Sequence, residues 1–309
     1  MTKRELKYFS VGFFLSLVFV LGMNDFRNIL ENFFYKEISE PFENMVLAQL
    51  PIKDEKPAIE AKSVISLKIN KYGREKILLR QNIDEILPIA SLTKLMTAVV
   101  VLENQNNYSF SKTIVLSEKA ASQDNVPIYG NFKQGDSFTI ENILRLMLIY
   151  SSNDVAWALS EVITTENFVQ KMNQKAQELG LTNTNFINPT GLEPKELNGS
   201  QIDPMQLNHS TSQDLLNLTR YILDKHPLIF QMSLDQGPYA THNGVSGIYF
   251  PPDFRAVGGK TGYTNEAGGC MLLVSENSQQ TIFINILLGA SSPTQRIVET
   301  QKLINWQTQ

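Results

Sequence analysis

Residues 88–102 read PIASLTKLMTAVVVL, a stretch in which a serine and a lysine stand at the start of an apolar run. Apolar residues recur on one face from Leu92 to Leu102, which predicts a helix that begins near Ser91. A helix places Ser91 and Lys94 on one face, with Cβ atoms about 5–6 Å apart. Lysine can activate a serine only when neutral, so its pKa must fall from about 10.4 to about 7–8. Burial and the positive end of the helix both lower it.

The Ser-x-x-Lys spacing alone is weak evidence, because the chain contains it twice. The second copy, Ser109 to Lys112, lies in a polar loop that leads into an apolar strand, so its geometry is not fixed and we discard it. A plain helix cap is the alternative interpretation of Ser91.

A second polar motif, Ser151-Ser152-Asn153, stands between two predicted helices. Ser151 could relay a proton between Lys94 and a leaving amine, and Asn153 could hold a substrate amide. Helix capping is the alternative for both residues. The same spacing recurs in residues 275–277, which we interpret as a surface turn between two strands.

A third motif, Lys260-Thr261-Gly262, occurs once, in the glycine-rich residues 258–264. On a strand, Lys260 and Thr261 would offer a charge and a hydroxyl to an anion, and Gly262 would let a ligand approach the backbone. A glycine-rich hairpin strand without such a role is the alternative.

In this order, the three motifs occur in class A β-lactamases and penicillin-binding proteins. Longer segments resemble the low-molecular-mass D-alanyl-D-alanine carboxypeptidases over about residues 58–306, although that family commonly has Gly at the position of Ser152. These segments are residues 88–98, 148–156, 185–192 and 259–268.

The resemblance implies that Ser91 is acylated, that Lys94 is the base, and that Ser151 and Asn153 complete the site. An oxyanion hole of two backbone N–H groups, from Ser91 and Tyr263, is also implied, each donor being worth about 2.7–4 kcal/mol. The resemblance also implies that Lys260 and Thr261 bind the substrate carboxylate, with help from Arg296. The implied substrate-binding residues are together Lys260, Thr261, Gly262, Tyr263 and Arg296. For Arg296, a solvated helix charge is an equal alternative.

Strands open and close the globular part, with helices between them, which predicts an α+β fold. The N- and C-terminal strands would share one antiparallel sheet, with a helical lobe beside it and an active site in the cleft between them. The resemblance implies the β-lactamase/transpeptidase-like fold. The predicted strands are 64–69, 77–79, 256–262, 268–275 and 281–289, and the clearest helices are 92–102, 140–150, 155–162, 214–223 and 293–306.

The composition argues against several kinds of partner and cofactor. The net charge of −4 gives no basis for nucleic-acid binding. A single cysteine and three scattered histidines predict neither a disulfide nor a metal site, and no cofactor is expected. We interpret Cys270 as a buried strand residue.

The N-terminus has a different composition. Lys3, Arg4 and Lys7 precede the uncharged run Tyr8 to Met23, and no small-residue cleavage site follows. We interpret residues 1–24 as an uncleaved membrane anchor, in preference to a cleaved signal, residues 25–57 as a spacer, and residues 58–309 as the peptidase domain. The domain would lie outside the cytoplasm of a bacterial cell, or be exported if the signal is cleaved.

The predicted activity is removal of the terminal D-Ala from peptidoglycan stem peptides, with β-lactams as covalent inhibitors. An endopeptidase that cuts cross-links, a class A-like β-lactamase and an inactive binding module are the alternatives. The lactamase motif needs a glutamate where Pro194 stands, so Glu193 and Glu196 miss its register. Two features depart from the family. Extra residues occur at 193–207, and the sequence ends at Gln309, where many relatives continue into a β domain and a C-terminal amphipathic anchor. We therefore expect the N-terminal segment to do the anchoring.

Overall fold

A computed structural model describes residues 56–123, 132–194, 203–234 and 244–308. Residues 55–309 form one compact unit, and residues 1–54 lie outside the described residues. The predicted anchor and almost all of the predicted spacer therefore fall outside them too. Among the described helices, none combines the length and the apolar composition needed to cross a bilayer.

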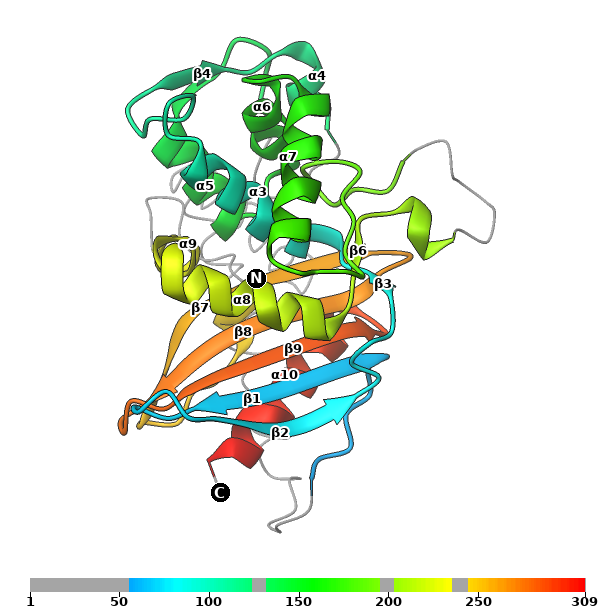
Figure 1. The fold of residues 1–309 in the computed structure, drawn as a ribbon, viewed down its shortest axis with the longest axis vertical. Coiled ribbons are helices and arrows are strands. Elements are labelled where there is room, and N and C mark those ends of the chain that lie inside the picture. Colours follow the sequence, from blue (N-terminus) through cyan, green and yellow to red (C-terminus); the bar gives the residue numbers. More distant parts are fainter. Residues whose placement is uncertain (1–55, 124–131, 195–202, 235–243, 309) are drawn as a thin grey trace, which may run out of the picture. The chain divides into compact units, whose positions relative to one another are not determined.

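The unit is built on a five-stranded antiparallel sheet in the order β2-β1-β9-β8-β7 (Figure 1). The first strand, β1, pairs along its whole length with the last, β9, so the two ends of the unit share one sheet as predicted. The bounds are β1 (Ser63–Ile69), β2 (Glu75–Gln81), β7 (Phe254–Thr264), β8 (Gly268–Asn277) and β9 (Ile282–Ala290).

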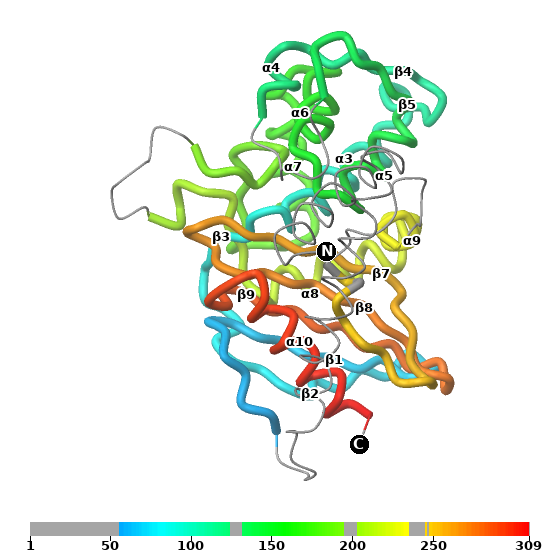
Figure 2. Tube along the Cα trace, turned by 180° about the vertical axis from the view of Figure 1, so that it is seen from behind, coloured from blue at the N-terminus to red at the C-terminus, as the bar shows by residue number. Residues whose placement is uncertain are grey.

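Both faces of the sheet are covered, which explains why β8 and β9 are apolar without alternation. Along β8, Cys270 and Leu272 join the larger core, on the face of the sheet that helix α8 (Ser212–Lys225) covers, whereas Met271 and Leu273 join the smaller core, on the face that α10 (Pro293–Gln307) covers. Figure 1 shows α8 on the near face, and Figure 2 shows α10 on the opposite one.

A helical lobe lies beyond the β7 edge of the sheet (Figure 1). It contains α4 (Glu118–Ala121), α5 (Ile140–Ile149), α6 (Asn153–Glu161) and α7 (Thr165–Glu178). The other elements are the short strands β3 (Leu87–Pro88), β4 (Thr113–Val115), β5 (Ser137–Thr139) and β6 (His209–Ser210), helix α9 (Leu228–Ser233), and the 3-10 helices η2 (Ala90–Leu92), η4 (Pro204–Gln206) and η5 (Gly244–Gly247).

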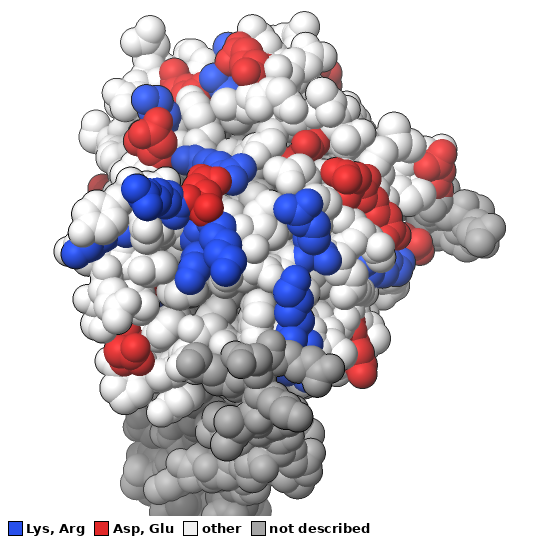
Figure 3. Space-filling view, turned by 60° about the horizontal axis from the view of Figure 1, so that its bottom comes forward, with Lys and Arg blue, Asp and Glu red and all other residues white. Residues whose placement is uncertain are grey.

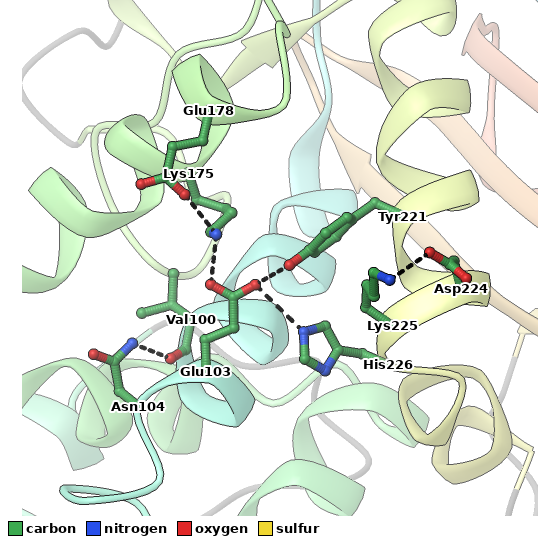
Figure 4. A network of polar contacts seen from close by, with 9 residues as sticks. All are labelled: Val100, Glu103, Asn104, Lys175, Glu178, Tyr221, Asp224, Lys225 and His226. Atoms are coloured by element: carbon green, nitrogen blue, oxygen red, sulfur yellow. Dashed lines mark hydrogen bonds and ion pairs between the residues drawn. The ribbon is translucent and has the colours of Figure 1, made fainter.

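Helix α3 (Thr93–Glu103) joins the two parts: it packs against the lobe and α9, while η2 before it packs against β7 and β8. Every residue from Thr93 to Leu102 is buried, as in a helix surrounded by protein. The C-terminal end of α3 is held by Glu103, which contacts Lys175 of α7 (2.7 Å), Tyr221 of α8, and His226 just after α8 (3.3 Å; Figure 4).

Charged side chains of both signs share the face in Figure 3, where basic groups are interrupted by acidic and uncharged surface. One exposed ion pair, Arg220 of α8 with Glu75 of β2, connects that helix to the edge strand. Pairs this exposed contribute about 0–1 kcal/mol, so buried apolar contacts hold the layers together.

Three sequence interpretations need correction. Residues 275–277 are no surface turn, because they end β8 and Ser275 is fully buried. Strand β4 is the apolar strand expected after Lys112, but its partner β5 and helix α9 were not predicted. Short elements such as these are determined by tertiary contacts more than by local pattern.

Candidate active site

Ser91 lies in η2, which runs directly into α3, so the predicted helix start is confirmed. The residue before it, Ala90, has φ +44°, a left-handed conformation that is costly for a residue with a Cβ. No side-chain cap forms at the start of α3, which removes capping as the explanation of Ser91.

Lys94 is fully buried and makes three contacts through its amine. Its Nζ lies 2.9 Å from Ser91 Oγ, 2.7 Å from Asn153 Oδ1 and 2.6 Å from the carbonyl oxygen of Thr190. The structure thus brings together two of the predicted motifs around this amine.

Burial lowers the pKa of Lys94 well below its ordinary value, and the charge of Lys260 lowers it further. The sequence interpretation named burial and the helix end; the structure gives burial first and a second lysine next. A buried amine without an anionic partner is most stable in its neutral form.

A neutral amine has two N–H donors and one lone pair. Asn153 Oδ1 and the Thr190 carbonyl oxygen can only accept, so together they occupy both donors. The lone pair then faces Ser91 Oγ, in the direction from which a base takes the hydroxyl proton.

The Ser151-Ser152-Asn153 motif forms the turn between α5 and α6. Ser152, not its neighbours, caps α6 by accepting from Val155 N (3.5 Å), which leaves the other two side chains for other contacts. Ser151 has φ +61° and accepts a hydrogen bond from Lys260 Nζ (2.8 Å). Positive φ in such residues is a form of backbone strain that gathers at functional sites.

Lys260 lies on the edge strand β7, is 2% exposed, and also donates to the Thr261 carbonyl oxygen (2.9 Å). Burial, with the charge of Arg296 second, lowers the pKa of Lys260 to about 7. Near neutral pH this amine can therefore carry a charge or lose it with little change in free energy.

Gly262 lies directly against the nucleophile segment. A Cβ there would stand 2.9 Å from Ser91 N and 3.0 Å from the Ile89 carbonyl oxygen, closer than real Cβ contacts allow. Tyr263, the next residue, is 44% exposed. Arg296 of α10 is half-buried and donates from Nη1 to the Gly262 carbonyl oxygen (2.6 Å), so it is not a solvated helix charge.

Sequence reasoning missed the Thr190 carbonyl, because any residue type carries that atom. The available signal was the segment 185–192, quoted above only as a resemblance. Gly191 in this segment has φ +86°, and a Cβ there would stand 2.0 Å from the Ala90 carbonyl oxygen.

In the described part of the chain, no group of His, Cys, Asp and Glu side chains is arranged to hold a metal ion. Cys270 is buried in β8, where burial raises the pKa of its thiol to about 11, so the predicted structural role is confirmed.

Known proteins match this chain over most of its length. A family profile described as D-alanyl-D-alanine carboxypeptidase matches residues 51–292. The D-alanyl-D-alanine carboxypeptidase DacF of Bacillus subtilis is 30% identical over 260 residues, covering 81% of this chain and 62% of the relative. A D-alanyl-D-alanine endopeptidase of Pseudomonas aeruginosa is 28% identical over 75% of this chain and 73% of its own length.

Among solved structures, penicillin-binding protein D2 of Listeria monocytogenes in its ampicillin-bound form is 26% identical, with a TM-score of 0.67. That match covers 83% of this chain and all of the other. The chain thus spans less than two thirds of DacF but matches a complete smaller penicillin-binding protein chain. The predicted transpeptidase-like α+β fold is confirmed, and the chain belongs to the D-alanyl-D-alanine carboxypeptidase family.

Proposed function

We propose that this chain is a serine-type D-alanyl-D-alanine carboxypeptidase that removes the terminal D-Ala from peptidoglycan stem peptides. The observation that carries the proposal is the fully buried Lys94 amine, 2.9 Å from Ser91 Oγ, with a pKa well below its ordinary value. Family membership makes the peptide substrate the first choice.

In the proposed acylation step, Ser91 Oγ attacks the carbonyl carbon of the penultimate D-Ala. Lys94 takes the hydroxyl proton, and the new C–O bond gives a tetrahedral intermediate whose oxyanion faces the N–H groups of Ser91 and Tyr263. The amide C–N bond then breaks, and Ser151 relays the proton that Lys94 took from Ser91 to the leaving amine, which leaves Lys94 neutral again. Water hydrolyses the ester in a second step and frees Ser91.

The substrate carboxylate is proposed to bind at β7, through the cationic Lys260 and the hydroxyl of Thr261. Gly262 keeps the space beside Ser91 N clear of a side chain. Arg296 contributes a positive charge close to Lys260 and holds the Gly262 carbonyl oxygen at 2.6 Å. Asn153 completes the set by fixing the Lys94 amine.

Endopeptidase action on cross-links is the second candidate, because the Pseudomonas aeruginosa relative carries that name. Digestion of purified muropeptides followed by mass analysis separates the two. Loss of a single D-Ala from monomeric pentapeptides supports the carboxypeptidase, whereas conversion of cross-linked dimers to monomers supports the endopeptidase. If neither product forms, the proposed function is wrong.

The two lysines predict a bell-shaped dependence of kcat/KM on pH. On the acid side, protonation of Lys94 removes the base. On the alkaline side, Lys260, with a pKa of about 7, loses the charge that binds carboxylate, so kcat/KM falls above that pH.

Arg296→Gln removes a neighbouring positive charge, so the pKa of Lys260 should rise and the alkaline limb should move to higher pH.

Arg296→Lys is the matched control, because it keeps a charge and should leave the alkaline limb near its wild-type position. The measurement is kcat/KM for a D-Ala-D-Ala peptide from pH 5 to 10. An unchanged alkaline limb in Arg296→Gln would show that Arg296 does not act on Lys260.

We further propose that residues 1–24 anchor the protein in a bacterial membrane, with residues 25–57 as a spacer and the peptidase domain, residues 58–309, outside the cytoplasm. The support is the basic flank and the uncharged run from Tyr8 to Met23. N-terminal sequencing of the mature protein tests this, since a start beyond Met23 would show cleavage and exclude an anchor.

A further inference from the structure

We propose that Asn208 is a positioning residue for Lys94, because it fixes the Thr190 carbonyl group that directs the lysine lone pair; this rests on the proposed function. The two acceptors of the Lys94 amine are supported differently. Asn153 is the first residue of helix α6, and that helix holds its backbone in place. Thr190 lies in a segment without helix or strand, so other groups must hold its carbonyl.

Within that segment, Asn188 shapes the turn that presents the carbonyl. Its Oδ1 accepts from the backbone N–H groups of Thr190 (3.1 Å) and Gly191 (2.8 Å) and from Thr190 Oγ1 (3.0 Å). Its Nδ2 donates to the Leu192 carbonyl oxygen (2.8 Å). Side chains of Asn commonly close such turns by bonding to the backbone that follows.

Asn208 attaches this turn to helix α3. Its Oδ1 accepts from the N–H groups of Ile187 (2.8 Å) and Asn188 (3.2 Å), and its Nδ2 donates to the Asn188 carbonyl oxygen (2.9 Å). The same Nδ2 lies 2.9 Å from Oγ1 of Thr93, the residue before Lys94. Asn208 is 3% exposed, so these bonds do not compete with bulk water.

A second attachment comes from one turn further along the helix, where Thr97 Oγ1 donates to the Pro189 carbonyl oxygen (2.8 Å). Thr93 and Thr97 stand on either side of Lys94 in the sequence. The helix that carries the lysine therefore also holds the loop that orients it. Asn208 is the side chain that bonds to both the helix and the loop backbone.

Loss of Asn208 should release the Thr190 carbonyl group while leaving the carboxylate-binding residues of β7 in place. The Lys94 amine would then keep one fixed acceptor, and its lone pair would no longer be held toward Ser91 Oγ. A misplacement of about 1 Å can cost about 10²-fold in rate. The chemical step should slow, whereas substrate affinity should change little.

The test compares kcat and KM for a D-Ala-D-Ala peptide, and the rate of penicillin acylation, in wild type, Asn208→Ala and Asn285→Ala. Asn285 is the matched control: it is a buried asparagine on β9 that bonds through both side-chain atoms to Gln307 of α10 (3.2 and 2.7 Å). Asn208→Ala should lower kcat and acylation about 10²-fold with KM within about threefold. Asn285→Ala should lose thermal stability but keep kcat.

Thr93→Val gives a milder variant, which is nearly isosteric and removes only the acceptor on α3. Its acylation rate should fall about fivefold, and combined with Asn208→Ala it should add little further loss. The positioning role is wrong if wild type is acylated and the Asn208→Ala variant, correctly folded, is acylated at the same rate. Equal losses of kcat in Asn208→Ala and Asn285→Ala would also overturn it, and an inactive wild type would instead overturn the proposed function itself.

Discussion

Replacing Lys94 with methionine should slow acylation of Ser91 by about 10²–10⁴-fold, the range that a positioned general base supplies. Methionine has a similar length and tolerates full burial, so the fold should survive. The Asn153 and Thr190 oxygens would lose their donor, which should cost some stability. The measurement is the rate of penicillin adduct formation by intact-protein mass.

Lys175→Met is the control for this experiment. Lys175 forms ion pairs with Glu103 (2.7 Å) and Glu178 (2.6 Å) at the far end of α3, where Figure 4 shows it. That variant should lose stability yet acylate at the wild-type rate. If Lys94→Met acylates within tenfold of wild type, another group is the base.

Gly191→Ala should combine a large loss of activity with a clear loss of stability. The new Cβ would stand 2.0 Å from the Ala90 carbonyl oxygen and 3.0 Å from Ser91 N, and backbone atoms cannot move away as side chains do. Both the nucleophile segment and the Thr190 loop must shift. We expect acylation to fall at least about 10²-fold and the free energy of unfolding to drop by about 2–5 kcal/mol.

Gly180→Ala is the control that measures the cost of a positive φ without the steric clash of the new Cβ. Gly180 also has a positive φ, +67°, but a Cβ there would meet nothing within 4 Å. It should cost about 1–2 kcal/mol in thermal or urea unfolding without affecting acylation. Equal behaviour of the two variants would show that the contact between Gly191 and Ala90 has no special importance.

Periodic patterns explain why much of the fold could be predicted from the sequence. The helical spacing from Leu92 to Leu102 predicts that Ser91 and Lys94 stand at the start of one helix. In the structure, Lys94 Nζ lies 2.9 Å from Ser91 Oγ. The opening and closing apolar strands indicated a shared sheet, which β1 and β9 form. The type of each element depends on local sequence, whereas the shared sheet was indicated by the order of strands and helices along the chain.

Contacts between distant segments could not be predicted in the same way. Lys94 contacts the carbonyl oxygen of Thr190, which is 96 positions away in the sequence. Lys260 contacts Ser151, from which it is separated by 109 positions. The first contact uses a backbone atom, which leaves no signature in residue type. The strained φ of Ala90 and Ser151 is also invisible in the sequence, since neither residue is a glycine or asparagine.

The claim that Ser91 is the acylated nucleophile of a penicillin-binding peptidase is tested most directly by intact-protein mass after incubation with penicillin. A β-lactam presents a strained amide beside a carboxylate, like the end of a D-Ala-D-Ala peptide, and its leaving group stays tethered after the ring opens, which hinders water. Wild type should gain one drug mass that persists, and Ser91→Ala should gain none. A labelled Ser91→Ala variant, or rapid drug turnover without a lasting adduct, would contradict the account.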